Sequence, residues 1–186
     1  VAAMLQSIKA KTTGLNPETD QILEVGAVLA LKPGSLLDMP TFHTRIRYDR
    51  LEGAPYALML NSKIIEDMAK LPREDVDGWI RLHDLGKLFR KWLEENGVER
   101  VHPCGKNFQG FDRQFLWRVP GWPKQMFTHR ALDCGTMYAS WHGIPGLDAF
   151  LDPPGLEGKA HEALFDAYKA LYWAMKALDK NTPAVL

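Results

Sequence analysis

The chain has 186 residues, of which 23 are basic and 23 acidic, so its formal net charge is zero. This balance argues against a protein that coats nucleic acid without specificity, although it is compatible with a local basic cleft. The sequence has no apolar run long enough to span a membrane, no basic-then-apolar leader, and only two cysteines. We therefore expect one cytoplasmic domain over residues 1–186, not associated with a membrane, with reduced thiols.

The first quarter of the chain has the composition of β-strands. Residues 21–32 are rich in Val, Ile and Leu, and residues 42–48 alternate between apolar and polar side chains, as a strand with one wet face does. The Pro-Gly pair within residues 32–38 is a strong turn signal. We expect three consecutive strands that form an antiparallel meander, at residues 4–10, 21–32 and 42–48.

After residue 55 the apolar residues recur at helical spacing. Within residues 79–97, one face is predicted to carry Trp79, Leu82, Leu85, Leu88, Phe89 and Trp92. The predicted elements are helices at 56–71 and 79–97, a strand at 98–105, a helix at 111–119 ended by Pro120, a short strand and a helix within 128–143, a helical turn at 146–152, a loop at 153–159 and a helix at 160–180. Strands followed by alternating strands and helices predict an α/β domain with a mixed central sheet.

Three segments contain the candidate catalytic side chains. The first is KAKTTG (9–14), at the end of a predicted strand, and the second is GKNFQGFDRQFL (105–116), with Asp112 near a helix start. In the third, HEALFD (161–166), the histidine lies five residues before Asp166. Five residues make about a turn and a half of helix, so His161 must lie at or before the helix start.

In order and spacing, these segments resemble the motifs of the DEDD 3′→5′ exonucleases of the histidine subclass (DEDDh), which include RNase T, polymerase proofreading subunits and oligoribonuclease. The family's motifs are Asp-x-Glu-Thr-Thr-Gly, an Asp at a helix start, and His-x4-Asp. The resemblance covers nearly the whole chain, including TTGLNPETDQILEVGAV (12–28), PYALMLN (55–61) and RALD (130–133). It implies a single DEDDh exonuclease-like domain with an RNase H-like fold, in which helices flank the mixed sheet.

One departure from the family concerns the two acids of the first motif, which are replaced by Lys9 and Lys11. Active relatives hold two Mg²⁺ or Mn²⁺ ions between four carboxylates. An ammonium group repels such a cation, and only Asp112 and Asp166 remain as acids. We therefore expect no metal cofactor, with Asp166 as the residual ligand position, and activity near background. The resemblance assigns the catalytic positions to Lys9, Lys11, Asp112, His161 and Asp166, with His161 in the place of the general base.

Charge and geometry suggest what the two lysines do. They lie two residues apart on a strand, so both point to one face of the sheet. Two ammonium groups (+2) and two carboxylates (−2) sum to zero, as four carboxylates (−4) and two divalent ions (+4) do. The lysines could therefore take about the places of the metals. The alternatives are exposed strand residues, purely structural ion pairs, phosphate-binding groups, and engineered inactivation.

The resemblance also implies a substrate side. In the family, the turn after the first motif contacts the 3′-terminal nucleotide, with the leucine wedged against a base. The implied substrate-binding residues are Thr12, Thr13, Gly14, Leu15, Lys106 and Asn107. The expected partner is a single-stranded DNA or RNA 3′ end, and a homodimer is compatible with the sequence.

Three functions remain open from the sequence. The first is a protein that binds 3′ ends without cutting them, the second an active exonuclease with an atypical site, and the third a partner-binding scaffold. Other notable residues have plainer interpretations. Phe108, Phe111 and most tryptophans are expected in the core, and Asp133 is expected to be structural.

Overall fold

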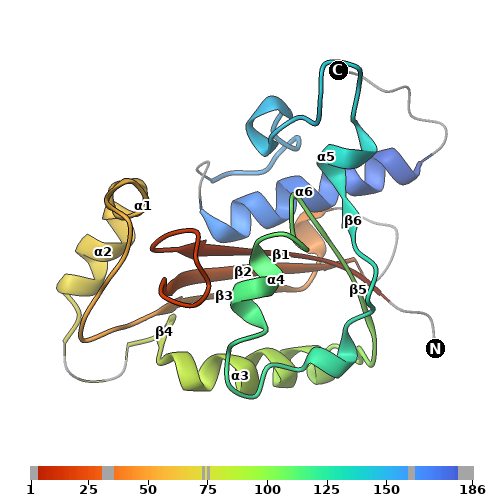
Figure 1. Cartoon of the computed structure of the whole chain (residues 1–186). Coiled ribbons are helices and arrows are strands. Elements are labelled where there is room, and N and C mark those ends of the chain that lie inside the picture. Colours follow the sequence, from red (N-terminus) through yellow and green to blue (C-terminus); the bar gives the residue numbers. More distant parts are fainter. Residues whose placement is uncertain (1–3, 31–35, 73, 75, 159–161, 180–186) are drawn as a thin grey trace.

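A mixed sheet lies at the centre of the fold (Figure 1). The structure is a computed structural model that describes residues 4–30, 36–72, 74, 76–158 and 162–179. Within these residues the sheet has six strands in the order β4-β3-β2-β1-β5-β6. The strands are β1 (Met4–Thr12), β2 (Ile22–Ala30), β3 (Thr41–Ile46), β4 (Trp79–Ile80), β5 (Val101–Gly105) and β6 (Leu132–Asp133).

The strand pairing agrees with the sequence prediction. β2 pairs antiparallel with both β1 and β3, so the first three strands form the expected meander. β5 runs parallel to β1, and β6 runs parallel to β5. The predicted α/β fold with a mixed sheet is therefore confirmed.

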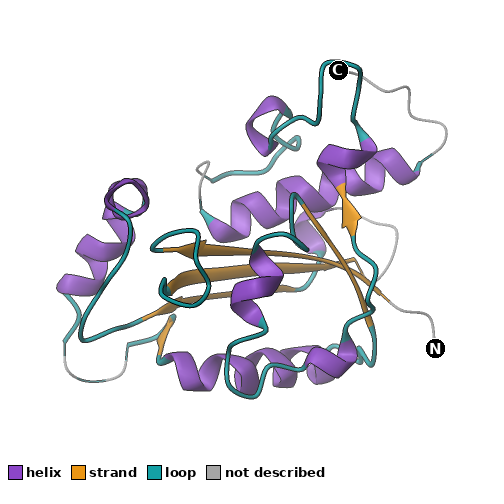
Figure 2. Ribbon diagram, viewed as in Figure 1, coloured by secondary structure: helices purple, strands orange, loops and turns teal. Residues whose placement is uncertain are grey.

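Helices cover both faces of the sheet (Figure 2). α6 packs over β1 and β2 on one face, and α3 lies against the other. The helices are α1 (Pro55–Leu60), α2 (Ser62–Ala69), α3 (Leu82–Glu95), α4 (Asp112–Leu116), α5 (Cys134–Met137) and α6 (Ala163–Leu178), with short 3₁₀ helices at Leu36–Asp38, Lys124–Met126 and Leu147–Ala149. In the described part of the chain, no helix is both long and apolar enough to cross a membrane.

Two predicted helices differ from the helices in the structure: one is divided into two, and the other begins later. The helix expected at 56–71 is divided at Asn61, whose side-chain amide donates to the Ala57 and Thr12 carbonyls. The helix expected at 79–97 begins at Leu82, because Trp79 pairs with Arg45 of β3 in a two-residue strand.

The predicted helix faces and ends also need correction. Leu88, placed on the buried face by its spacing, is 37% exposed. The helix at 111–119 ends at Leu116, ahead of the residue before Pro120, where helical backbone is disfavoured. The helix within 128–143 has a single turn. The predictions for residues 31–35, 159–161 and 180 lie outside the described residues.

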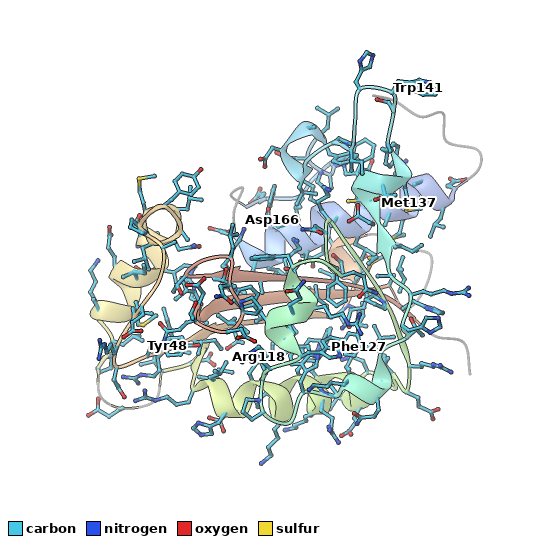
Figure 3. All side chains as sticks on the ribbon, in the orientation of Figure 1. Tyr48, Arg118, Phe127, Met137, Trp141 and Asp166 are labelled. Carbon is cyan, nitrogen blue, oxygen red and sulfur yellow. The ribbon has the colours of Figure 1, made fainter. Side chains whose placement is uncertain are left out.

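The tryptophans do not share one environment. Trp122 is buried and stacks on Phe89 with 4.3 Å between ring centroids, and Phe108 is buried as expected. Trp141 lies fully exposed at the tip of a loop (Figure 3), so it is an exception to the expectation that most tryptophans lie in the core. Its neighbours in the chain are polar or glycine, so it belongs to no apolar helix face.

The core contains one polar side chain whose replacement should stabilise the fold. Gln6 of β1 is fully buried, and neither its amide nitrogen nor its amide oxygen has a hydrogen-bond partner within the described residues. Replacing such a group by an apolar one of similar shape removes its desolvation penalty. We expect Gln6→Met to raise the free energy of unfolding by about 1 kcal/mol in urea titration.

The matched control for this change is Gln21. Its amide donates to the Arg50 carbonyl and accepts from the Glu52 N–H, so both groups are used. Gln21→Met should therefore lower the free energy of unfolding. An equal loss of stability in both variants would show that Gln6 is held by an ordered solvent molecule.

Candidate functional site

Two lysine–aspartate ion pairs lie together at the end of β1. The Lys9 Nζ lies 2.9 Å from Asp112 Oδ2, and the Lys11 Nζ lies 2.6 Å from Asp166 Oδ2. Each lysine side chain is 14% exposed, whereas the carboxylates of Asp112 and Asp166 are 0% and 12% exposed. β1, α4 and α6 thus bring four residues from the three sequence motifs into one place.

The Lys9–Asp112 pair is the more deeply enclosed of the two. The Lys9 ammonium also donates to the Lys106 carbonyl at 2.8 Å, and Asp112 Oδ1 accepts the Ala10 N–H at 2.8 Å. Burial raises the pKa of Asp112, while the nearby Lys9 ammonium and the Ala10 N–H oppose that rise. The buried carboxylate therefore depends on Lys9 for its charge.

The second pair is formed at the start of α6, where Figure 3 labels Asp166. Asp166 lies in the first turn of this helix, and its N–H donates to the Glu162 carbonyl at 3.0 Å. Lys11 reaches it from the neighbouring strand because β1 runs beneath the helix. His161 lies outside the described residues.

The turn after β1 is held firmly and projects one apolar side chain. The Thr12 hydroxyl donates to the Gly14 carbonyl at 2.6 Å, and Thr13 is tied to Gln21 through its backbone N–H and its side-chain oxygen. A Cβ on Gly14 would overlap the Asp20 carboxylate, so the turn has no room for a larger residue. Leu15 is 82% exposed at its end.

We call the place where the Lys9–Asp112 and Lys11–Asp166 pairs lie the cleft. Lys106 and Asn107 lie beside it, because the Lys106 carbonyl accepts from Lys9, and both residues contact Asp133. The Lys106 side chain runs across Gly135, and its Nζ lies 4.0 Å from Asp133 Oδ1. Asn107, in the left-handed backbone region at φ 57°, donates its N–H to the other oxygen of Asp133. Since Asp133 also caps α5 by accepting the Thr136 N–H, its expected structural role agrees with its contacts.

An apolar surface on α1 was not found by sequence reasoning. Tyr56, Met59 and Leu60 are 69%, 62% and 49% exposed. The chain just before this helix is fastened to the turn after β1, because the Ala54 N–H donates to the Thr13 carbonyl at 2.8 Å. The available signal was PYALML itself, a helix sequence with no charged residue on any face.

The side chains around the ion pairs do not fit a divalent cation. Mg²⁺ and Mn²⁺ are bound by oxygen ligands, and two of the four groups here are ammonium ions that repel them. Each remaining carboxylate already accepts a lysine. Among the described residues, no group of three or more His, Cys, Asp or Glu side chains is placed to hold a metal.

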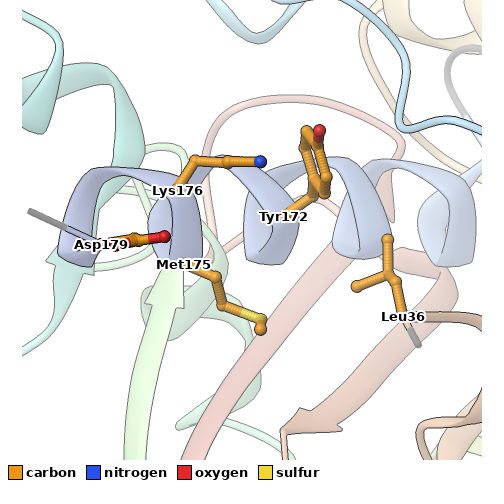
Figure 4. A pocket seen from close by; sticks show the side chains of 5 residues that line it. All are labelled: Leu36, Tyr172, Met175, Lys176 and Asp179. Atoms are coloured by element: carbon orange, nitrogen blue, oxygen red, sulfur yellow. The ribbon is translucent and has the colours of Figure 1, made fainter. Parts of the chain in front are cut away.

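A separate hollow lies along α6, away from the ion pairs. It has a volume of about 300 Å³ and is shown in Figure 4. Its lining residues come from the C-terminal half of α6 and from the segment after β2: Leu36, Tyr172, Met175, Lys176 and Asp179. Asp166 lies at the opposite end of the same helix, so this hollow is not part of the cleft.

The fold is that of the exonucleases with an RNase H-like sheet. Exonuclease I of Escherichia coli, solved in complex with a dT13 oligonucleotide, matches 97% of this chain and 42% of its own length, with a TM-score of 0.65 and 16% identity. A zinc-bound form of the E. coli enzyme with single-stranded DNA gives a TM-score of 0.66 over 96% of this chain and 41% of its own. Exonuclease I of Methylocaldum szegediense gives 0.59 over 95% of this chain and 40% of its own.

Sequence comparison finds a curated relative. Ribonuclease T of Yersinia enterocolitica is 35% identical over 114 residues, which are 59% of this chain and 50% of the relative. No protein-family model matches the sequence. The chain is thus similar in sequence to Ribonuclease T, over half of that relative's length, and similar in fold to Exonuclease I, which supports the resemblance to the DEDD-type 3′→5′ exonucleases.

Proposed function

We propose that this chain binds 3′ ends of single-stranded nucleic acid in the cleft at the end of β1 and cuts them at or near background. The observation that carries the proposal is the pair of contacts Lys9–Asp112 and Lys11–Asp166. Both surviving carboxylates are neutralised by ammonium groups, so the attacking water and the leaving oxygen lack the metal ions that two-metal hydrolysis requires. The two ion pairs nevertheless balance the charges of the cleft without metal ions.

Binding is supported by what surrounds the ion pairs. The exposed Leu15 and the apolar surface of Tyr56, Met59 and Leu60 offer faces for bases, and base stacking on such surfaces tolerates any sequence. Lys106, with its side chain 23% exposed, supplies a cation beside the cleft. The structural neighbour Exonuclease I has been solved with single-stranded oligonucleotides.

The finer assignments are part of the same proposal. His161 precedes Asp166 by five residues, which supports the histidine subclass. A pseudoenzyme of this kind needs no Mg²⁺ or Mn²⁺, since its lysines already balance the carboxylates. The cytoplasmic location, the single-domain organisation over residues 1–186 and the homodimer stay predictions.

The proposal predicts binding without cleavage. A fluorescent single-stranded dodecamer, as DNA and as RNA, should bind in the presence of EDTA, and 10 mM Mg²⁺ or Mn²⁺ should neither change the affinity nor shorten an end-labelled strand. We expect Leu15→Ala to weaken binding about tenfold, since burial of one leucine side chain against a base contributes about 1.5 kcal/mol or more.

Leu151→Ala is the matched control, because Leu151 is also largely exposed but lies in the loop before α6. It should leave the affinity unchanged. Metal-dependent shortening that disappears in Asp166→Asn would instead support an active enzyme. Failure of every oligonucleotide to bind would leave the scaffold as the better explanation.

A further inference from the structure

Glu24 of β2 is a buried carboxylate whose contacts converge on the helix that carries Asp166. It is 1% exposed. Its Oε2 accepts the Ala163 N–H at 2.8 Å, across 139 residues of chain. Ala163 is the first residue of α6, and the side chain of the preceding residue, Glu162, makes no capping hydrogen bond. A strand residue therefore caps this helix.

The other oxygen of Glu24 is held from β3. Oε1 accepts from His43 Nε2 at 2.9 Å and from Arg45 Nε at 3.2 Å, and Arg45 is itself fixed by Asp67 of α2 at 3.2 Å. Burial raises the pKa of Glu24, but the hydrogen bonds from His43, Ala163 and Arg45, together with the nearby charge of His43, lower it on balance. The carboxylate is thus ionised near neutral pH, which suits the positive end of a helix dipole.

A glycine next to this cap fixes how closely the helix approaches the sheet. A Cβ on Gly26 would lie 2.3 Å from the Leu164 N, so the first turn of α6 rests directly on the β2 backbone. In the β1–β2 register, Glu24 faces Lys11 and Gly26 faces Lys9. The two residues that seat the helix are therefore the direct cross-strand neighbours of the two site lysines.

We propose that Glu24 is the positioning residue of the cleft: by capping Ala163 it fixes where α6 begins, and so holds Asp166 against Lys11. Asp166 lies three residues after Ala163, less than one turn along the helix. A shift of the helix start would move its carboxylate away from the 2.6 Å contact with Lys11. The Lys9–Asp112 pair should not follow, because Asp112 belongs to α4.

This difference between the two lysines supplies the test. Side-chain ¹⁵N NMR of the lysine ammonium groups should show, in Glu24→Ala, that the Lys11 signal moves toward that of exposed lysines while the Lys9 signal stays in place. Glu24→Gln keeps an oxygen that can accept the Ala163 N–H, so it should restore the Lys11 signal. Joint movement of both signals in Glu24→Ala, or movement of neither, would overturn the proposal.

A second measurement does not depend on the variant that risks misfolding. In the unmodified protein, the Ala163 amide should exchange with solvent about tenfold more slowly than a free first-turn amide, and Glu24→Gln should keep most of this protection. Exchange of Ala163 at the free rate in the unmodified protein would contradict the cap. The inference rests on the proposed function only in naming the cleft as the site, and neither measurement uses nucleic acid. Failure of oligonucleotide binding and failure of the cap are therefore separate outcomes.

Discussion

Replacing Lys9 by Asp and Lys11 by Glu together is expected to give a chain that binds Mg²⁺ or Mn²⁺ and trims single strands from the 3′ end. Lys9 and Lys11 point at Asp112 and Asp166 from one face of β1, so the exchange places four carboxylates around one space. We expect trimming at least ~100-fold above the unmodified chain, because metal-activated water and stabilised charge supply most of such a rate enhancement. Calorimetry and end-labelled oligonucleotides measure the two effects.

The control for this change removes the ammonium groups without adding ligands. Lys9→Asn with Lys11→Gln should neither bind metal with measurable stoichiometry nor trim. Each single acid substitution should bind metal more weakly than the double, since a lysine remains in the cleft. A double revertant that folds and binds metal yet trims nothing would mean that the remainder of the site, including the position of His161, is not intact.

The parts of the fold that the sequence predicted are those with a local signal. The first strands are rich in Val, Ile and Leu, as buried strands are. Both antiparallel pairings that we predicted are present. The strand at Trp79 has only two residues, which is too short to show the alternation of apolar and polar side chains. Its residues were therefore assigned to the helix predicted next to it. Leu88 was misplaced because a helix buries a stripe narrower than its set of apolar residues.

The candidate site divides in the same way. The register of the TTG turn and the balance of charges predicted that Lys9 and Lys11 would meet Asp112 and Asp166, and the structure has both contacts. The cap from Glu24 to Ala163 joins residues 139 apart, and no window of sequence contains both partners. Only the folded chain brings together the strand that positions the helix and the helix that completes the cleft.

The ion pairs also predict an unusual effect of removing one acid. Asp166→Ala leaves the Lys11 ammonium, 14% exposed, without its 2.6 Å partner. Breaking a buried pair in this way costs about 3–5 kcal/mol, and the partial exposure of both groups favours the lower end of that range. We expect Asp166→Ala to lower the melting temperature by roughly 6–12 °C, given about 2–4 °C per kcal/mol for a domain of this size.

The same substitution should have the opposite or a negligible effect in the Lys9→Asp, Lys11→Glu background without metal. There four carboxylates crowd one cleft, and removing one relieves their repulsion. Asp49→Ala serves as the control in both backgrounds, because Asp49 is 88% exposed beside Arg81 and such surface pairs contribute little. Thermal melts in EDTA compare six proteins, namely the two parent chains and the two variants of each. Equal losses on Asp166→Ala in both backgrounds would show that Lys11 turns to solvent, and the lysines would then not stand in for metal ions.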